Sequence, residues 1–218
     1  MRFSSTIVFL TLVTSSLALG ADAPPAYMTH MIVEMTGSEI PSDSFAAKPK
    51  IMWRAATAFC RIDEEPDEKY GIHGRIIIHE PDVWMVNRAD NTARHFVDKG
   101  PTFNCRLPMF AFDAETLKTK IGELEFGREL EFFQKNGAVR VDGPKVSFAA
   151  NYYELKIDDA VLRLVEIADI HAPKMVGFTR GTKSYVVEYH LWDDHVPFKP
   201  EVFAKPSDVK IEEQELKK

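Results

Sequence analysis

The chain has 218 residues, of which 45% are hydrophobic and 28% are charged. This balance suits one domain or two small ones and excludes an oily bundle of membrane helices. Aromatic residues, at 11%, argue against a disordered chain. The 27 basic and 33 acidic residues give a net charge of −6, so the chain has no overall attraction to nucleic acid or to an anionic lipid surface. We therefore expect no nucleic-acid partner.

The first 20 residues have the layout of a secretory signal peptide. Arg2 supplies a positive charge, residues 7–13 are apolar, and the small residues Ala18 and Gly20 precede the expected cleavage site. The apolar run is shorter than the ~20 residues that a spanning helix needs, which disfavours the alternative of an uncleaved anchor. The sequence thus predicts a signal peptide at 1–20 and a single mature domain at 21–218, without a transmembrane segment, exported to the bacterial periplasm.

The first half of the mature chain predicts strands. Residues 28–35 are apolar and could form a strand or a short helix, and residues 51–62 alternate imperfectly over the length of one long strand. Three short β-branched or aromatic segments follow at 74–79, 83–87 and 92–97. Polar turns separate them, a pattern that is typical of an antiparallel meander.

The middle of the chain, residues 107–137, is poor in β-branched residues and predicts two short helices, although 123–126 could also form a strand. Apolar residues repeat there at helical spacing, namely Leu117, Ile121 and Leu124, then Phe126, Leu130 and Phe133.

Strand patterns return in the last third of the chain. They cover residues 145–157, 161–170, 175–179 and 184–192, with a short strand at 209–211. The order strands, helices, strands predicts an α+β fold, a curved antiparallel sheet (a half-open β-barrel) with helices covering one face.

The sequence shows no catalytic signature. His190 and His195 are the densest pair among seven histidines, but on a strand they would point to opposite faces and they lack the spacing of a zinc helix. We therefore expect no enzymatic activity, no metal and no cofactor. An exported hydrolase that uses the region 190–195 is retained as an alternative.

Apolar residues lie on both faces of the predicted strands, whereas a sheet that is wet on one side alternates more cleanly. This pattern favours a cavity for an apolar ligand, with an ordinary filled core as the alternative. Arg54 or Arg61 would lie near its mouth, close to a polar headgroup or to carbonyls of the covering helices, unless both reach into solvent. The residues expected to line the cavity are Trp53, Phe59, Ile76, Ile78, Trp84, Val86 and Phe96.

Two regions carry a family resemblance. Gly74-Arg75-Ile76-Ile77-Ile78, then Pro81-Asp82, then Val83-Trp84-Met85-Val86-Asn87 form the first, and Val187-Glu188-Tyr189, Val196-Pro197, Phe203, Pro206 and Val209-Lys210-Ile211 form the second. In these motifs the chain resembles the periplasmic outer-membrane lipoprotein carriers, the LolA-like family. It departs at Asp208, where the family has Gly, and it lacks the family's early Arg-Pro pair.

The resemblance implies a half-open barrel with helices as a lid and a hydrophobic cavity that takes acyl chains. The expected function is therefore an exported monomer that binds a lipid or an acylated protein and carries it across the periplasm. A periplasmic sensor that binds a protein partner on the same scaffold is the alternative.

Cys60 and Cys105 are the only cysteines. An exported compartment permits a disulfide between them. In a flat meander three strands would separate them by roughly 15–19 Å, beyond the ~7 Å limit between Cα atoms. A bond therefore requires residues 103–107 to cross the sheet or the sheet to curl strongly, and both redox states remain open.

Overall fold

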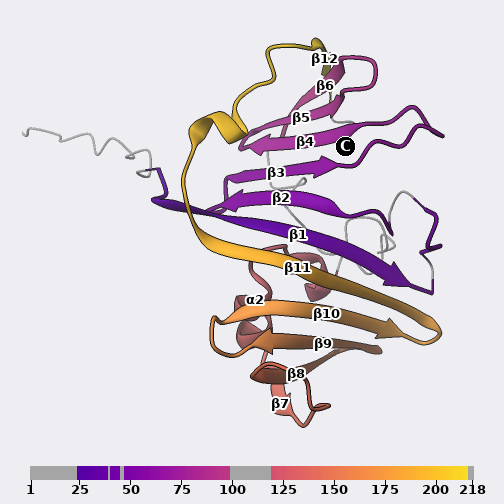
Figure 1. The fold of residues 1–218 in the computed structure, drawn as a ribbon, viewed down its shortest axis with the longest axis vertical. Helices are drawn as coiled ribbons and strands as arrows, with labels where there is room; N and C mark the ends of the chain where they lie inside the picture. The colour runs from indigo at the N-terminus through magenta and orange to yellow at the C-terminus, as the bar shows by residue number, and fades with distance from the viewer. Residues whose placement is uncertain (1–23, 39, 45–46, 99–118, 216–218) are drawn as a thin grey trace, which may run out of the picture.

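The computed structural model describes residues 24–38, 40–44, 47–98 and 119–215 (Figure 1). The predicted signal peptide, Leu117 and Cys105 lie outside the described residues. Among those that are described, no helix is long and apolar enough to cross a membrane.

Twelve strands form one sheet (Figure 1), in the order β12-β6-β5-β4-β3-β2-β1-β11-β10-β9-β8-β7. Neighbours are antiparallel except β12, which runs parallel to β6. Because β12 and β7 are its two ends, the sheet is not closed. The strands are β1 (Tyr27–Gly37), β2 (Lys50–Ala55), β3 (Phe59–Glu64), β4 (Gly74–His79), β5 (Asp82–Asn87), β6 (Thr92–Val97), β7 (Val139–Val141), β8 (Ala150–Ile157), β9 (Ala160–Ile167), β10 (Ala172–Arg180), β11 (Lys183–Pro197) and β12 (Lys210–Gln214).

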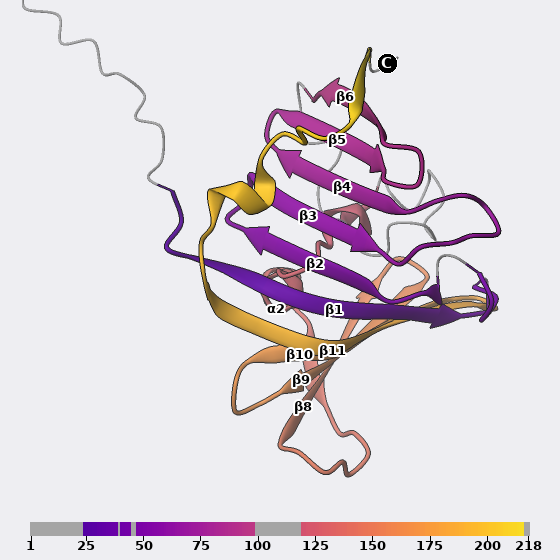
Figure 2. The same cartoon turned by 45° about the horizontal axis from the view of Figure 1, so that its top comes forward.

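The two longest strands, β1 and β11, pair at the centre of the sheet. Their register shifts twice, between Met28 and His30 and between Ile32 and Val33, and such irregularities increase the local twist of a strand pair. Figure 2 shows the strands beyond β11 turned out of the plane of β2–β6. The curved antiparallel sheet that the sequence predicts is therefore present.

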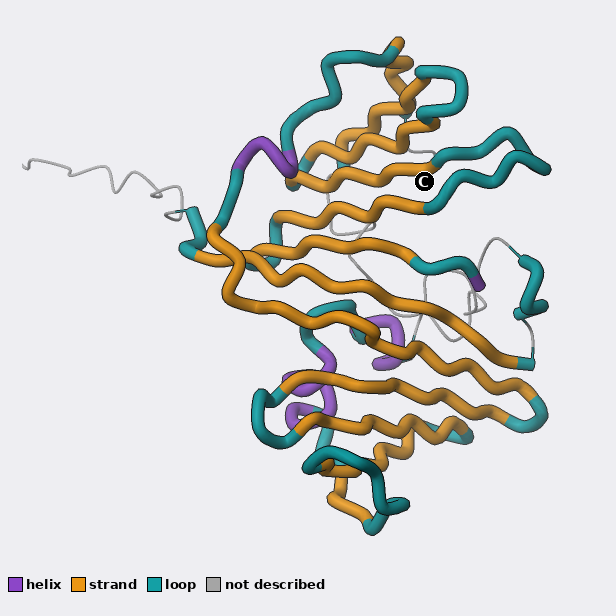
Figure 3. The backbone as a smooth tube through the Cα atoms, in the orientation of Figure 1, coloured by secondary structure: helices purple, strands orange, loops and turns teal. Residues whose placement is uncertain are grey.

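Within the described ranges, three short helical segments accompany the sheet: η2 (Lys120–Glu123), α2 (Glu129–Lys135) and η3 (Pro200–Phe203). Figure 3 shows how little of the described chain is helical. Packing places α2 mainly against β9 and β10. We call the face on which α2 lies the inner face and the opposite one the outer face. Among the described residues, α2 is an α-helix of seven residues on this face, and much of the segment predicted to be helical, residues 107–118, lies outside the described residues.

The helical spacing in the middle of the chain is interrupted within the described residues. Ile121 lies in η2, and Leu124 is the extended residue at which η2 ends. Gly127 then takes a φ of +83°, in the left-handed region that favours glycine. Ile121, Leu124 and Phe126 are nevertheless all buried. Their spacing correctly predicts that these side chains are buried. The backbone that carries them is irregular and does not form the longer helix that the spacing predicts.

The predicted long strand over residues 51–62 is wrong, since the segment folds into the hairpin β2–β3. Ala55 pairs with Phe59, and the intervening turn places Ala56 at a φ of 47°. The turn contains no Gly, Pro or Asn, the residues by which sequence signals a turn. Residues 28–35 form part of a strand and not of a helix.

Several strand boundaries also differ from the predicted ones. The strand predicted from residue 145 begins at Ala150, and β11 continues past Trp192 to Pro197. The last strand runs from Lys210 to Gln214. It is tied to the sheet by His95 of β6, which lies 2.8 Å from Asp82 and 2.5 Å from Glu213.

Cys60 of β3 is buried on the inner face and is held in a disulfide. Cys105 is the only other cysteine of the chain, so we predict a Cys60–Cys105 bond. Tryptic mapping without reduction should give one cross-linked peptide, and thiol titration of the denatured protein should find no free thiol. Two free thiols per chain would contradict the bond.

Candidate functional site

The inner face is apolar across both halves of the sheet. Its buried residues come from alternate positions of β1–β5 and β8–β11, as the two-residue period of a strand requires. They include Met31, Val33, Met52, Ile62, Ile78, Val83, Leu155, Leu162, Leu164, Val176, Phe178 and Val187. The face therefore offers one continuous apolar surface on the concave side of a curved sheet.

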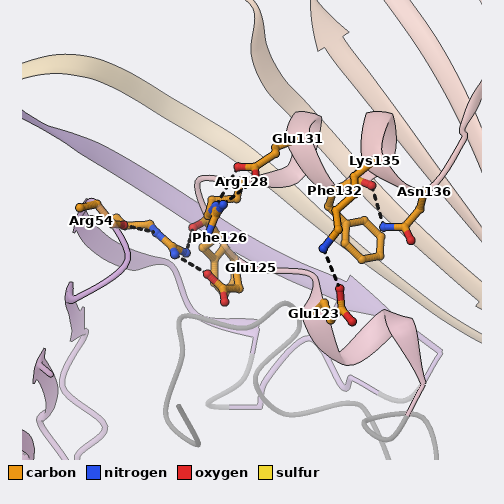
Figure 4. A network of polar contacts seen from close by, with 10 residues as sticks. Arg54, Glu123, Glu125, Phe126, Arg128, Glu131, Phe132, Lys135 and Asn136 are labelled. Carbon is orange, nitrogen blue, oxygen red and sulfur yellow. Dashed lines mark hydrogen bonds and ion pairs between the residues drawn. The ribbon is translucent and has the colours of Figure 1, made fainter. Parts of the chain in front are cut away.

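Residues 120–136, which we call the cover, pack onto part of this surface. Ile121, Leu124, Phe126, Phe132 and Phe133 belong to the same buried cluster as the inner-face residues. Lys135 of α2 lies 3.4 Å from Glu123 of η2, and Asn136 closes the helix by donating to the carbonyl of Phe132 at 2.9 Å (Figure 4). The cover thus combines an apolar inner side with polar bonds along its own length.

Arg54 of β2 joins the sheet to the cover (Figure 4). Its Nη1 donates to the carbonyl oxygen of Phe126 at 2.7 Å, and its Nη2 forms an ion pair with Glu125. The side chain is buried, so these partners compensate the cost of removing its charge from water. A Cβ atom on Gly127 would lie 3.0 Å from Cδ of Arg54, so glycine allows the close approach.

Glu129, the first residue of α2, makes the second polar connection. It is 1% exposed, and its Oε1 accepts bonds from the hydroxyl of Tyr189 in β11 and from the backbone N–H of Gly127, the latter at 2.8 Å. Its Oε2 is buried and has no hydrogen-bond partner among the described residues. Burial raises the pKa of Glu129 to about 7, although Tyr189, Gly127 and Arg54 oppose the rise. Burial also raises the pKa of Tyr189.

The far end of the inner face is more open. Met85 of β5 is 41% exposed, while its partner Ile76 and nearby Phe96 are half-buried and pack against the inner cluster. A separate pocket of about 300 Å³ lies beside Arg54, lined by Tyr27, Thr29, Gly127 and Arg128 among others. Apolar surface is therefore accessible at β4–β6, and a polar opening lies next to the cover.

The seven residues predicted to line one cavity are divided between the two faces. Ile76, Ile78 and Phe96 lie on the inner face, whereas the other four lie on the outer face. The register explains the division, because Trp84 pairs with Ile77 and not with Ile76 or Ile78. The four on the outer face are Trp53, Phe59, Trp84 and Val86.

Outer-face residues contact the C-terminal part of the chain. Trp84 and Val86 form a cluster onto which Val209 and Ile211 pack. Trp53 and Phe59 pack around Phe203 of η3, which is fully buried. The apolar character of the two faces thus has two causes. The outer face is covered by the C-terminal part of the chain, and the inner face is covered, among the described residues, by the cover.

The two arginines predicted at the mouth also separate. Arg54 pairs with Cys60 in the hairpin and Arg61 with Trp53, so they project from opposite faces. Arg61 binds Asp63 at 2.6 Å, donates to the carbonyl of Val202 at 3.3 Å and lies over the Trp53 ring. Only Arg54 remains at the candidate site.

The region 190–195 shows no buried metal centre. His190 lies 3.0 Å from Glu34 of β1. Asp193, Asp194 and His195 could offer three ligand atoms within 4.8 Å, but all three residues are exposed, and the part of the chain that the structure describes holds no other such group. Exposed acidic groups are common without a metal, so this cluster defines no site.

Comparison with known proteins identifies no family. No family model matches the chain, and no curated protein matches it. An uncharacterized conserved protein from Thermus thermophilus has a similar structure, with a TM-score of 0.53 at 8% identity over 87% of this chain and 91% of that one. The two proteins share a fold.

Two further solved structures match with lower scores. A LolA superfamily protein from Nitrosomonas europaea has a TM-score of 0.37 at 8% identity, over 84% of this chain and 91% of that chain. PNGF-II has a TM-score of 0.36 at 9% identity, over 88% of this chain and 32% of its own. Scores this low do not establish a common fold.

Replacing Arg54 by Met should weaken the attachment of the cover. The change removes the bond to Phe126 and leaves the half-buried Glu125 without its partner, which costs up to about 3 kcal/mol of unfolding free energy. Urea unfolding measures this loss. The control is Arg163→Met, which breaks an exposed pair with Glu154 and should cost less than about 0.5 kcal/mol. Equal losses in the two variants would contradict a structural role for Arg54.

Proposed function

We propose that this protein is an exported, non-enzymatic binding protein that takes the acyl chain of a lipid or an acylated protein on its inner face. The observation that carries the proposal is the extent of this face. It is apolar from β8 to β6, whereas α2 packs mainly against β9 and β10. At the other end, Met85 is 41% exposed beside the half-buried Ile76, and this apolar surface would meet a ligand.

The physical requirement of such a ligand fits a curved sheet. Each CH₂ group of an acyl chain in water costs about 0.8 kcal/mol, so its passage through an aqueous compartment needs an apolar container. A concave apolar face with a small movable cover supplies the container, and pockets of this kind are lined mainly by apolar side chains with few polar groups. Arg54 and Arg128 at the pocket beside the cover would meet an anionic headgroup.

The biological setting is part of the proposal. The signal-peptide pattern supports export, and the resemblance of two regions to the LolA-like family supports a periplasmic carrier that acts as a monomer. The shared fold with the Thermus thermophilus protein adds no functional information, because that protein is itself uncharacterized.

Binding of the apolar dye 1-N-phenylnaphthylamine, and its displacement by palmitate, tests this proposal. The double variant Ile76→Gln/Met85→Gln places two amides on the open part of the inner face and should weaken dye binding at least tenfold, since each amide must lose water without gaining a partner. The matched control is Ile51→Gln/Val97→Gln, which alters two outer-face residues of similar exposure, 37% and 46%.

The control should bind the dye as the wild type does. Dye binding that is equal in both double variants, while circular dichroism shows both folded, would contradict binding at the inner face. Dye displacement with no lipid found in extracts of the purified protein would direct the search to acylated proteins.

A further inference from the structure

We infer that the cover is a proton-controlled gate, in which Glu129 holds α2 on the inner face when its carboxyl group is protonated and releases it when ionised. The inference rests on the proposed function, since it assigns regulation to the same apolar face. The contacts of α2 that carry it lie within the described residues.

The geometry of Glu129 sets up two states. Its carboxyl group lies between the start of α2 and β11, with Oε1 bonded to Tyr189 and Gly127. Oε2 is buried without a hydrogen-bond partner among the described residues. A neutral acid tolerates this position, whereas a carboxylate would leave one charged oxygen without any donor, at a substantial cost in free energy.

Ionisation therefore favours a state in which Glu129 meets water. Because Glu129 begins α2, the carboxylate cannot be hydrated unless the start of the helix moves away from β11. That movement also breaks the contacts of Phe132 and Phe133 with the inner cluster. A proton on one buried side chain is thereby coupled to access to the apolar face.

The direction of the effect follows from linkage. The pKa of Glu129 is about 7 when α2 is docked, against an ordinary value of 4.5, so docking is favoured by protonation. This stabilisation is full below pH 4.5 and is lost as the pH rises through about 7. The ratio of open to docked α2 should therefore rise by up to about two orders of magnitude over this range.

The titratable side chains on the strands that contact α2 do not replace Glu129 as the acid that controls its docking. Tyr189 of β11 donates to it, and Arg54 of β2 lowers its pKa but is already paired with Glu125. On β9 the buried acid is Glu166, whose pKa is lowered on balance by Asn151, His171 and Tyr153 despite its burial.

Other described charged groups near α2 form ion pairs. Lys174 of β10 forms an ion pair with Glu188 at 2.9 Å and donates to the Tyr189 carbonyl. At the start of α2, Arg128 binds Glu131 at 2.6 Å. The bond to Arg128 lowers the pKa of Glu131, so this acid is ionised throughout the range in which Glu129 titrates.

Hydrogen exchange of the α2 amides tests the gate without any ligand. Exchange is measured in the wild type and in Glu129→Gln at the same pH, so that the intrinsic pH dependence of exchange cancels in the ratio. The ratio of wild-type to variant rates should rise at least tenfold from pH 5 to pH 8.5. A ratio that stays constant across this range would overturn the inference.

Two further variants make the test specific. Glu131→Gln changes an exposed acid of the same helix and should leave the pH profile of α2 exchange as in the wild type. Tyr189→Phe removes a bond that lowers the pKa of Glu129, so the midpoint of the transition should move to higher pH. If Glu129→Gln fails to fold, the pH midpoint of the exchange transition in Tyr189→Phe provides the test. A midpoint that is the same as in the wild type overturns the gate.

Failure of the gate and failure of the proposed function give different results. Dye binding that is lost in Ile76→Gln/Met85→Gln together with pH-independent α2 exchange would retain an acyl-binding face without a gate. The opposite pair of results, pH-dependent exchange with no dye binding, would retain a proton-controlled α2 and remove the acyl ligand.

Discussion

The central pairing of β1 with β11 is the constraint on which the rest of the structure depends. These strands come from opposite ends of the described chain, so their pairing joins the β2–β6 meander to the β7–β10 meander in one sheet. The register shifts in this pair fall at the centre of the sheet, where it bends. A bent sheet has a concave side, and this side cannot be filled by the sheet's own residues.

Covering the concave side requires polar contacts as well as apolar ones. Phe132 and Phe133 provide the apolar contact, but α2 has only seven residues and buries too little to be stable alone. Arg54 and Glu129 tie its start to β2 and β11 with bonds that exist only when the cover is in place. Such bonds specify one docked position, and they also make docking sensitive to the charge of the groups involved.

Strands, and the face on which each residue lies, can be predicted from sequence, because the two-residue period of a strand still assigns the faces correctly where a turn has been missed. The alternation places Trp53 and Phe59 on one face and they share it, although the turn at Ala56 divides the predicted strand. The turn itself escapes prediction because its residues carry none of the usual signals. The sequence also predicts two apolar faces, but the second apolar layer is explained by Phe203, Val209 and Ile211, whose contacts are remote in sequence.

The sequence names Arg54 as one of two arginines near carbonyls of the covering segment, but the acidic part of the site could not be predicted. Glu129 lies among Glu125, Arg128 and Glu131, and no sequence signal distinguishes a buried acid from an exposed one in such a segment. Tyr189 belongs to a family-like motif that assigns it no role. Its pairing with Glu129 depends on tertiary packing over 60 residues of chain separation.

The central claim is that an acyl chain lies on the inner face. Intermolecular nuclear Overhauser effects between ¹³C-labelled palmitate and the methyl groups of this protein measure that contact directly. The account predicts contacts from the acyl chain to the methyl groups of Ile76, Ile78 and Met85, and none to Ile51 or Val97 on the outer face. Contacts to the outer-face methyl groups, or no contacts at saturating palmitate, would contradict it.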